Sequence, residues 1–221
     1  MATLSSLHQK GSKFRQFLRD YSHMVCKLTP FSPRLILFAG HAGTGKSTLA
    51  KRALPLIIEK TGEDFFFLDK DTVYGEFSAH VMALTTQNPN DRDSPYYLEN
   101  LRDWEYQGLI AIARENLLLG VNVILVGPFS KEIQSGKMFN AKDLGVPPQT
   151  NIQIAWVDLQ EDEAKIRMEK RADPRDQWKL AHWTQYITRR IDPPIHPVLH
   201  RFDNLLFNEA TFENLIDQLI Q

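Results

Sequence analysis

The chain has 221 residues, 43% of them hydrophobic and 24% charged, so it can bury one core and has the composition of a folded globular protein. No apolar run reaches the roughly 18 residues that span a bilayer, and a formal net charge of −1 gives no overall field for a nucleic acid. The single cysteine, Cys26, excludes an internal disulfide and a cysteine zinc site. We therefore expect a cytoplasmic monomer or homodimer without a membrane or nucleic-acid partner.

The first 33 residues are predicted to form a helical extension that precedes the main domain at 34–221. Its excess of basic residues also occurs in transit peptides. An apolar stripe at helical spacing favours instead an uncleaved helix that packs on the domain. The stripe consists of Phe14, Phe17, Leu18, Tyr21, Met24, Val25 and Leu28.

From residue 35 onward, short apolar runs alternate with segments of helical period. The predicted strands are 35–39, 65–68, 121–126, 152–157 and 205–207, and the predicted helices include 46–60, 98–119 and 162–172. A last helix carries Phe212, Leu215, Ile216 and Leu219 on one face. This alternation predicts an α/β fold with a doubly wound, parallel, five-stranded sheet, whose active site lies beyond the carboxyl ends of the strands. We assign 72–120, which is longer than a simple crossover requires, to an acceptor-covering subregion.

Residues 40–47, Gly-His-Ala-Gly-Thr-Gly-Lys-Ser, satisfy the phosphate-loop pattern directly after a predicted strand and before a predicted helix. Backbone N–H groups of such a loop wrap a phosphate, while an ordinary glycine turn is the alternative. Lys46 is expected to reach the β- and γ-phosphates, and the Ser47 hydroxyl to bind Mg²⁺. His41 is expected to be a variable filler. The predicted nucleotide-binding residues are Gly40, Ala42, Gly43, Thr44, Gly45, Lys46, Ser47 and Thr48.

Two other classes of phosphate-loop protein lack their motifs. A GTPase carries Asn/Thr-Lys-x-Asp and an Asp-x-x-Gly after the third strand, and neither is present, which favours ATP over GTP. A motor ATPase needs an apolar strand that ends in Asp-Glu, whereas the third predicted strand runs into Gly127-Pro128-Phe129.

Two carboxylates follow the second predicted strand. A period of two places Asp69 and Asp71 on one face, with Lys70 turned away. Such a pair can hold Mg²⁺ and accept a proton from an attacking hydroxyl, and a solvated turn or a helix cap is the alternative. We assign Asp69 to Mg²⁺ and Asp71 to the acceptor, although the spacing does not decide which residue takes which role.

The order of these features resembles the phosphate-loop small-molecule kinases: shikimate, gluconate and nucleotide kinases, zeta toxins, chloramphenicol phosphotransferase and the AAA-type kinases. The resemblance spans about 35–220 and rests on the phosphate loop, the Asp-x-Asp and an Arg-rich helix after the fourth strand. It implies ATP- and Mg²⁺-dependent transfer of the γ-phosphate to a hydroxyl of a small molecule. A toxin or antibiotic-modifying kinase shares every motif, and a nucleotide-dependent switch without an acceptor is the rival from another class. Polynucleotide kinase is disfavoured by the charge balance.

The resemblance also implies a lid over 167–180. Pro174 breaks a helix there, and a second helix with Leu180, Trp183, Ile187 and Ile191 on one side is expected to follow. Arginines at this place in related kinases stabilise the transferred phosphoryl group or stack on adenine. By this resemblance we assign stabilisation of the phosphoryl group to Arg171 and Arg175, and nucleotide binding to Arg167. For Arg167 the alternative is a surface ion pair with Glu163.

The remaining candidates concern adenine and the acceptor. Asn208 matches the loop that commonly holds adenine in such kinases, or it caps the last helix. Trp104 and Tyr106 are expected in the core. The predicted acceptor-binding residues are Asp69, Asp71, Arg92, Tyr97, Arg102 and Gly127.

Overall fold

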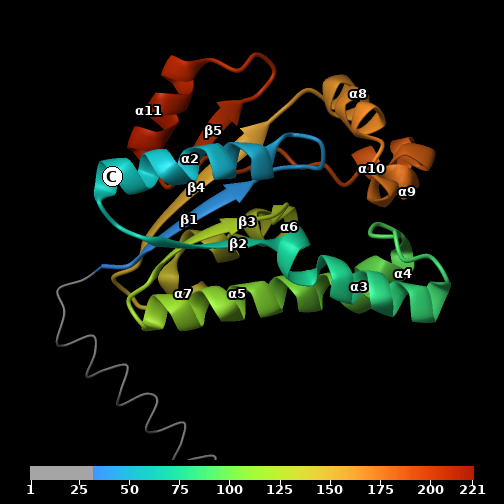
Figure 1. Cartoon of the computed structure of the whole chain (residues 1–221), viewed down its shortest axis with the longest axis horizontal. Helices are drawn as coiled ribbons and strands as arrows, with labels where there is room; N and C mark the ends of the chain where they lie inside the picture. The colour runs from blue at the N-terminus through green and yellow to red at the C-terminus, as the bar shows by residue number, and fades with distance from the viewer. Residues whose placement is uncertain (1–31) are drawn as a thin grey trace, which may run out of the picture.

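The computed structural model describes residues 32–221, so the apolar stripe expected at 14–28 lies outside the described residues. Five parallel strands form one sheet in the order β2-β3-β1-β4-β5 (Figure 1). Helices cover both faces of the sheet, which confirms the doubly wound α/β prediction. The strands are β1 Arg34–Ala39, β2 Phe65–Asp69, β3 Asn122–Val126, β4 Asn151–Asp158 and β5 Leu199–Asp203.

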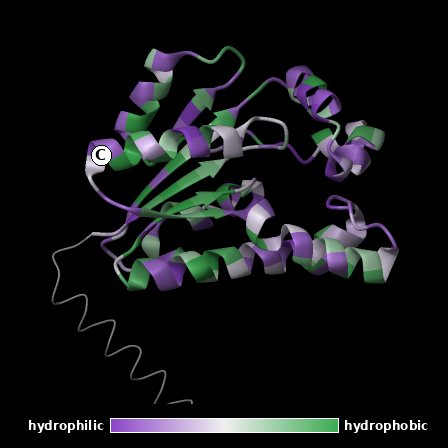
Figure 2. Ribbon diagram, viewed as in Figure 1, coloured by the Kyte–Doolittle hydropathy of each residue, from purple (hydrophilic) through white to green (hydrophobic). Residues whose placement is uncertain are grey.

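The central strands are apolar because both of their faces are covered (Figure 2). On one face Ile36 and Phe38 of β1 pack against α2 (Lys46–Thr61) and α11 (Glu209–Leu219). On the other face Leu35 and Leu37 pack with α5 (Asp103–Leu118), α6 (Ser130–Gln134) and α7 (Ala141–Leu144). Alternate residues of one strand therefore hold two helical layers, which fixes the position of β1 and of the loop that follows it.

The segment after β2 is almost entirely helical. It comprises α3 (Lys70–Thr86), α4 (Pro95–Tyr97) and a π-helical turn at Leu98–Arg102 that leads into α5. The single helix predicted at 98–119 is therefore divided near its start. Tyr106 is buried as expected, but Trp104 is 71% exposed, because it lies outside the period of the buried positions of α5.

The fifth strand lies at Leu199–Asp203, and its prediction at 205–207 was wrong. At the edge of the sheet β5 pairs only with β4, and Phe202 is its one buried residue. A half-solvated edge strand lacks the continuous apolar run by which buried strands are recognised. The apolar run at 205–207 belongs instead to a loop in which Leu206 is 84% exposed.

The expected break at Pro174 is present after α8 (Glu161–Arg171), where a 3-10 turn spans Pro174–Asp176. Two short helices, α9 (Gln177–Ala181) and α10 (Trp183–Ile187), follow in place of the single predicted helix. Their buried residues are Lys179 and Tyr186 rather than the predicted apolar side, because this region faces a polar cavity. No helix in the described part of the chain is long and apolar enough to cross a membrane.

Candidate active site

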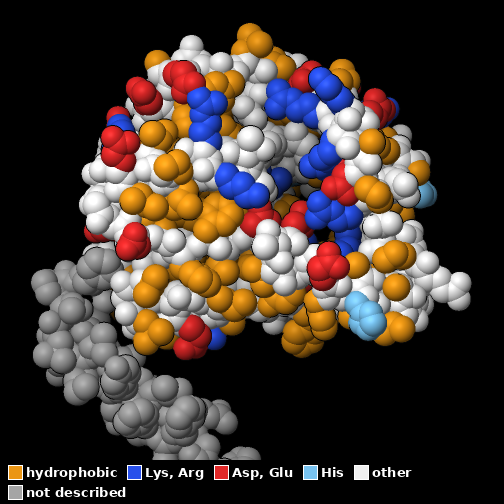
Figure 3. Space-filling model, in the orientation of Figure 1, with side chains coloured by type: hydrophobic (Ala, Val, Ile, Leu, Met, Phe, Trp, Pro, Cys, Tyr) orange, Lys and Arg blue, Asp and Glu red, His pale blue; other side chains and the backbone are white. Residues whose placement is uncertain are grey.

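A cavity of about 580 Å³ lies beyond the carboxyl ends of β1, β2 and β3. Phe38 of β1 and Asp69 of β2 both pair with Val126 of β3, so the three strands end at the same level. Lys and Arg side chains gather around a hollow on the visible face of the molecule, with Asp and Glu side chains among them (Figure 3). The predicted site residues that line the cavity are Ala42, Gly43, Gly45, Lys46, Ser47, Thr48, Asp69, Asp71, Arg92, Tyr97, Arg102, Gly127, Arg171 and Arg175.

The loop between β1 and α2 has the geometry of a phosphate-binding loop. Gly40 adopts φ 138°, and a Cβ there would lie 2.4 Å from the carbonyl oxygen of Val157. Gly45 adopts φ 90° and precedes α2, whose first turn receives no side-chain cap. The free N–H groups and the positive end of the helix dipole therefore point toward the cavity, as an anion requires.

The loop is held from behind by an asparagine that the sequence reasoning missed. The Asn204 amide donates to the carbonyl oxygen of Thr44 at 2.8 Å, and the Thr44 hydroxyl donates to the carbonyl oxygen of His41 at 3.0 Å. Gly40 and Thr44 do not line the cavity and belong to this supporting layer. Nothing in the motif marks Asn204, which reaches the loop only because β5 lies beside β4.

His41 links the loop to the segment that leads into β5. Its ring is buried and stands edge-on to Trp156, and its Nε2 lies 3.0 Å from the carbonyl oxygen and 3.1 Å from the backbone nitrogen of Ile191. Burial lowers the pKa of His41 to about 4, which keeps the imidazole neutral. His41 is thus a structural link between the loop and this segment.

Lys46 extends from the start of α2 along the loop. Its ammonium donates to the carbonyl oxygen of His41 at 2.7 Å. Desolvation lowers the pKa of Lys46 to about 8, against the opposing effect of Asp71 and Asp69. An anion bound in the loop would favour the charged form of this lysine, so anion binding and protonation of Lys46 are coupled.

The structure changes the predicted arrangement of the Asp-x-Asp segment. Asp69 ends β2 and caps α3, because its carboxylate accepts from the backbone N–H of Asp71 at 2.9 Å. Asp71 belongs to the first turn of that helix, and both carboxylates line the cavity. Lys70 was expected to turn away, but the helical turn buries it beside the cavity. The period-two argument failed at this point because the strand stops at Asp69.

Lys70 and Asp71 form the centre of a charged group. The Lys70 ammonium lies 2.9 Å from Glu105 and 3.2 Å from Asp71, while Arg175 lies 3.3 Å from Asp71 on its other side. Burial would raise the pKa of Asp71, but Lys70 and Arg175 outweigh burial and lower it below the usual value. Asp71 is therefore ionised at neutral pH.

Asp69 is suited to a cation. Its side chain is buried, with 6% of the residue exposed, and no Lys or Arg among residues 32–221 forms an ion pair with it. A buried carboxylate normally has a charged partner. Within the same part of the chain no group of three His, Cys, Asp or Glu side chains could hold a metal alone. Asp69 and Ser47 fit Mg²⁺ that takes its other ligands from phosphate and water.

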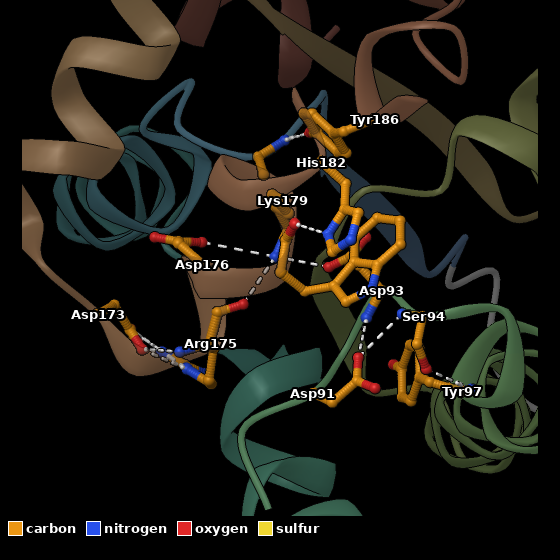
Figure 4. A network of polar contacts seen from close by, with 12 residues as sticks. Asp91, Asp93, Ser94, Tyr97, Asp173, Arg175, Asp176, Lys179, His182 and Tyr186 are labelled. Atoms are coloured by element: carbon orange, nitrogen blue, oxygen red, sulfur yellow. Dashed lines mark hydrogen bonds and ion pairs between the residues drawn. The ribbon is translucent and has the colours of Figure 1, made fainter. Parts of the chain in front are cut away.

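The region after α8 closes over the cavity through side chains that bridge to other elements (Figure 4). Arg175 contacts both Asp173 and Asp71, and Arg171 pairs with Asp176. Lys179 lies 2.6 Å from Asp93 and 3.5 Å from Asp176. These contacts bring the predicted lid arginines to the same cavity as the phosphate loop.

Arg167 and Asn208 do not line this cavity. Arg167 pairs with Glu163 at 3.1 Å, the predicted alternative, and also donates to the carbonyl oxygen of Asn204 at 2.9 Å. Asn208 caps α11 by accepting from the backbone N–H of Thr211 and lines a separate pocket of about 470 Å³. In this structure both residues make the contacts of their alternatives, an ion pair for Arg167 and a helix cap for Asn208.

The predicted acceptor residues line the same cavity, but some of them already bind other side chains of the protein. Arg102 binds Glu132 with two nitrogens, at 2.7 and 2.9 Å, and stacks over Tyr106. The Tyr97 hydroxyl donates to the buried carboxylate of Glu105. A Cβ on Gly127 would lie 2.9 Å from the ring of Phe129, so glycine lets this buried ring pack against the end of β3. Sequence reasoning missed Lys70, Lys179, Tyr186 and Arg189, which also line the cavity.

Comparisons with known proteins agree with this fold. A family model described as an AAA domain matches residues 35–194. An APS kinase from Mycobacterium tuberculosis, solved with AMPPNP and APS, is 18% identical over 87% of this chain and 100% of its own, with a TM-score of 0.57. Kti12 from Chaetomium thermophilum, solved with ADP-AlF3, is 14% identical over 85% and 97%, with a TM-score of 0.55.

A gluconokinase from Sinorhizobium meliloti is 15% identical over 86% of this chain and 93% of its own, with a TM-score of 0.53. At these identities the likeness shows a shared fold. No curated protein sequence matches the chain significantly.

Proposed function

The chain belongs to the AAA domain family whose model spans most of its length, and on that premise we propose that it is an ATP-dependent kinase of a small molecule. The observation that carries the proposal is the convergence of the phosphate loop, Asp71 and Arg175 on one cavity. The adenine nucleotide analogues held by the APS kinase and Kti12 structures support ATP as the phosphate donor. A cytoplasmic location and a monomeric or homodimeric state remain part of the proposal.

The phosphate loop would bind the β- and γ-phosphates through its backbone N–H groups and Lys46. Ser47 and Asp69 would hold Mg²⁺, which neutralises charge on the phosphates when bound. Arg171 and Arg175, at the rim of the cavity, would stabilise the negative charge that spreads over the phosphoryl group during transfer. Closure of the lid region excludes water, which would otherwise accept the phosphoryl group.

Asp71 would orient the acceptor hydroxyl. The hydroxyl oxygen forms a bond to the γ-phosphorus, the bond to the β–γ bridging oxygen breaks, and ADP leaves. The proton of the hydroxyl passes to Asp71 and then to solvent. Because the pKa of Asp71 is lowered, this carboxylate acts mainly by positioning the hydroxyl in a loose transition state that needs little proton removal beforehand.

Release of ADP from Mg²⁺-ATP, measured against a library of hydroxyl compounds, tests this function. We expect at least one compound to stimulate release, and Lys46→Ala to abolish the stimulation because the phosphates lose their clamp. Lys60→Ala is the matched control, since this lysine lies on the same helix and pairs with Asp217 at the surface. Turnover at the wild-type rate in Lys46→Ala would contradict the assignment.

The same experiment separates the alternatives. Tight ATP binding without phosphoryl transfer to any hydroxyl compound favours a nucleotide-dependent switch. Stimulation by an antibiotic, with none by any metabolite, favours an antibiotic-modifying kinase. The absence of a guanine-reading segment favours ATP, and equal affinities for ATP and GTP by calorimetry would contradict that preference.

A further inference from the structure

The two edge strands of the sheet differ in how their open sides are protected. Within the described part of the chain, β2 pairs only with β3, and β5 pairs only with β4. β5 carries the charged residues Arg201 and Asp203, whereas β2 reads Phe-Phe-Phe-Leu-Asp and has no charge before its last residue. An open edge can pair with another chain, and proteins blunt it with charged side chains or cover it. Charge protects β5, so β2 is the edge that needs a cover.

Apolar side chains gather around β2. Phe66 is 44% exposed and Leu119, at the end of α5, is 63% exposed. Phe66 pairs with Val123 of β3, so the partly exposed Val121 lies diagonally across from Phe66 on the same face of the sheet. Hydrophobic side chains are visible between α2 and α5 on this side of the molecule (Figure 3). We call this surface the β2 patch, and it consists of Phe65, Phe66, Phe67, Leu119 and Val121.

Exposed acidic side chains lie at the end of the patch where β2 starts. Asp64 immediately precedes β2, Glu59 belongs to the last turn of α2, and Glu115 lies one turn before Leu119 on α5. None of these three carboxylates forms an ion pair with another of residues 32–221. An apolar surface beside free carboxylates fits a partner that is apolar on one side and basic on its others.

The segment that precedes the described residues has this chemistry. Its predicted apolar stripe runs over 14–28, and the only acidic residue before residue 32 is Asp20. A helix over 14–28 would be about 22 Å long, and a strand of the length of β2 spans about 16 Å. The stripe is therefore long enough to cover the open side of β2. The basic residues of the segment are Lys10, Lys13, Arg15, Arg19 and Lys27.

The chain enters the domain close to the β2 patch. The backbone N–H of Arg34, at the start of β1, donates to the side chain of Asn122 at 2.9 Å, and Asn122 pairs with Phe65. The Arg34 guanidinium lies 3.0 Å from Glu63, which precedes β2. Only β3 separates β1 from β2, a distance of about 10 Å, while the chain from Leu28 to Arg34 can span about 20 Å. The stripe can therefore reach the patch.

We propose that the amphipathic segment at 14–28 packs its apolar stripe on the β2 patch and covers this edge of the sheet. Its basic side chains would then lie near Asp64, Glu59 and Glu115. Because β2 ends at Asp69 and leads directly into α3, the segment would support the strand that carries a carboxylate to the cavity. The proposal does not depend on the proposed kinase function.

Cysteine cross-linking in the full chain tests the proposal. Cys26 is the one cysteine of the sequence and lies off the apolar stripe, so it stays accessible when the stripe is covered. The reagent is a bismaleimide that spans about 10 Å, the width of a helix. With Leu119→Cys in the patch, we expect an intramolecular cross-link between positions 26 and 119 in most of the protein, identified by mass spectrometry after digestion.

Two pairs of variants control for reactivity and for the stripe itself. Leu206→Cys and Leu84→Cys place a cysteine at equally exposed leucines, on the loop after β5 and on α3, and should give at most a trace of cross-link to Cys26. Leu18→Asp, on the stripe, should reduce the cross-link to Leu119→Cys about tenfold, because a charge on an apolar contact is costly. Gln16→Asp, off the stripe, should leave it unchanged. Circular dichroism shows whether each variant is folded.

Three results would overturn the proposal. One is the absence of an intramolecular cross-link in Leu119→Cys, and another is equal cross-linking in Leu119→Cys, Leu206→Cys and Leu84→Cys. The third is a cross-linked dimer in place of the intramolecular product, which would show that a second copy of the chain covers the patch. None of these measurements involves nucleotide, so each result would leave the proposed kinase function as it stands.

Discussion

The hydroxyl of Tyr186, on α10, lies 3.1 Å from the backbone nitrogen of Ala42 in the phosphate loop and accepts its hydrogen bond. A loop N–H that is expected to bind phosphate is thus satisfied by a side chain from α10, which follows the predicted lid. Burial raises the pKa of Tyr186 to about 12, so the hydroxyl stays neutral. Filling the loop with nucleotide requires that this contact be exchanged for one with phosphate.

Removal of that hydroxyl should strengthen nucleotide binding. Tyr186→Phe keeps the ring against Arg189 but frees the N–H of Ala42. Because one hydrogen bond of about 1 kcal/mol no longer has to be broken, we expect up to about a fivefold tighter Kd for an ATP analogue by calorimetry. Weaker binding in Tyr186→Phe would show that the hydroxyl contacts the nucleotide.

Lys46 should give the activity an alkaline limb. Its pKa of about 8 in the free protein means that the ammonium is charged below pH 8 and loses its charge above it. Since phosphate binds the charged form, kcat/KM for ATP should fall as pH rises through about 8. Bound nucleotide favours protonation, so the limb in kcat should lie at higher pH.

The acid side of the same profile should be flat. The pKa of Asp71 lies below its usual value and that of His41 is about 4, so neither group titrates between pH 5 and 7. In Lys46→Arg the guanidinium remains charged at all these pH values. Nucleotide affinity in this variant, whether high or low, should therefore not fall as pH rises through about 8. Constant kcat/KM for ATP between pH 7 and 9.5 in the wild type would contradict the role of Lys46.

The two aspartates should differ in their response to Mg²⁺. Asp69→Asn keeps an oxygen for the cap of α3 but loses charge at the metal, so high Mg²⁺ should restore part of its transfer rate. Asp71→Asn should lose about 10²-fold or more in rate with no rescue. Transfer rates measured against Mg²⁺ concentration check both expectations.

Asp103→Asn serves as the control for this pair, because its carboxylate also lines the cavity but pairs with Arg102 and Lys131. Rescue of Asp71→Asn together with no rescue of Asp69→Asn would reverse the two assignments. Near-normal rates in both variants would show that the Asp-x-Asp segment serves only to cap α3.

Loss of Arg175 should lower kcat more than it raises KM for ATP. Arg175 bridges Asp173 and Asp71 at the rim of the cavity and can turn toward charge that develops during transfer. We expect Arg175→Gln to reduce kcat by about 10²-fold and Arg171→Gln to reduce it less, because Arg171 is held by the buried Asp176. Arg201→Gln controls for loss of surface charge, because Arg201 lies on β5 and pairs with Asp158 and Asp192. An unchanged kcat in Arg175→Gln would show that this arginine has a structural role and does not act in phosphoryl transfer.

The sequence by itself determined four of the five strands, the phosphate loop and the break at Pro174. These features are local, because buried strands are continuous apolar runs and the loop requires glycine where φ is positive, as at Gly40 and Gly45. The edge strand β5 was misplaced because its exposed side removes the apolar signal. Trp104 was misplaced because an aromatic residue carries no information about which side of α5 faces the sheet.

Only the tertiary structure decided which polar side chains share the cavity. Lys70 enters it because α3 begins directly after β2 ends at Asp69, whereas the period-two argument assumed an extended chain as far as Asp71. Asn204 reaches Thr44, and Arg189 reaches Asp93, across more than ninety positions of the chain. No spacing in the sequence encodes such pairs, since they depend on strand order and on how α10 folds back over the loop.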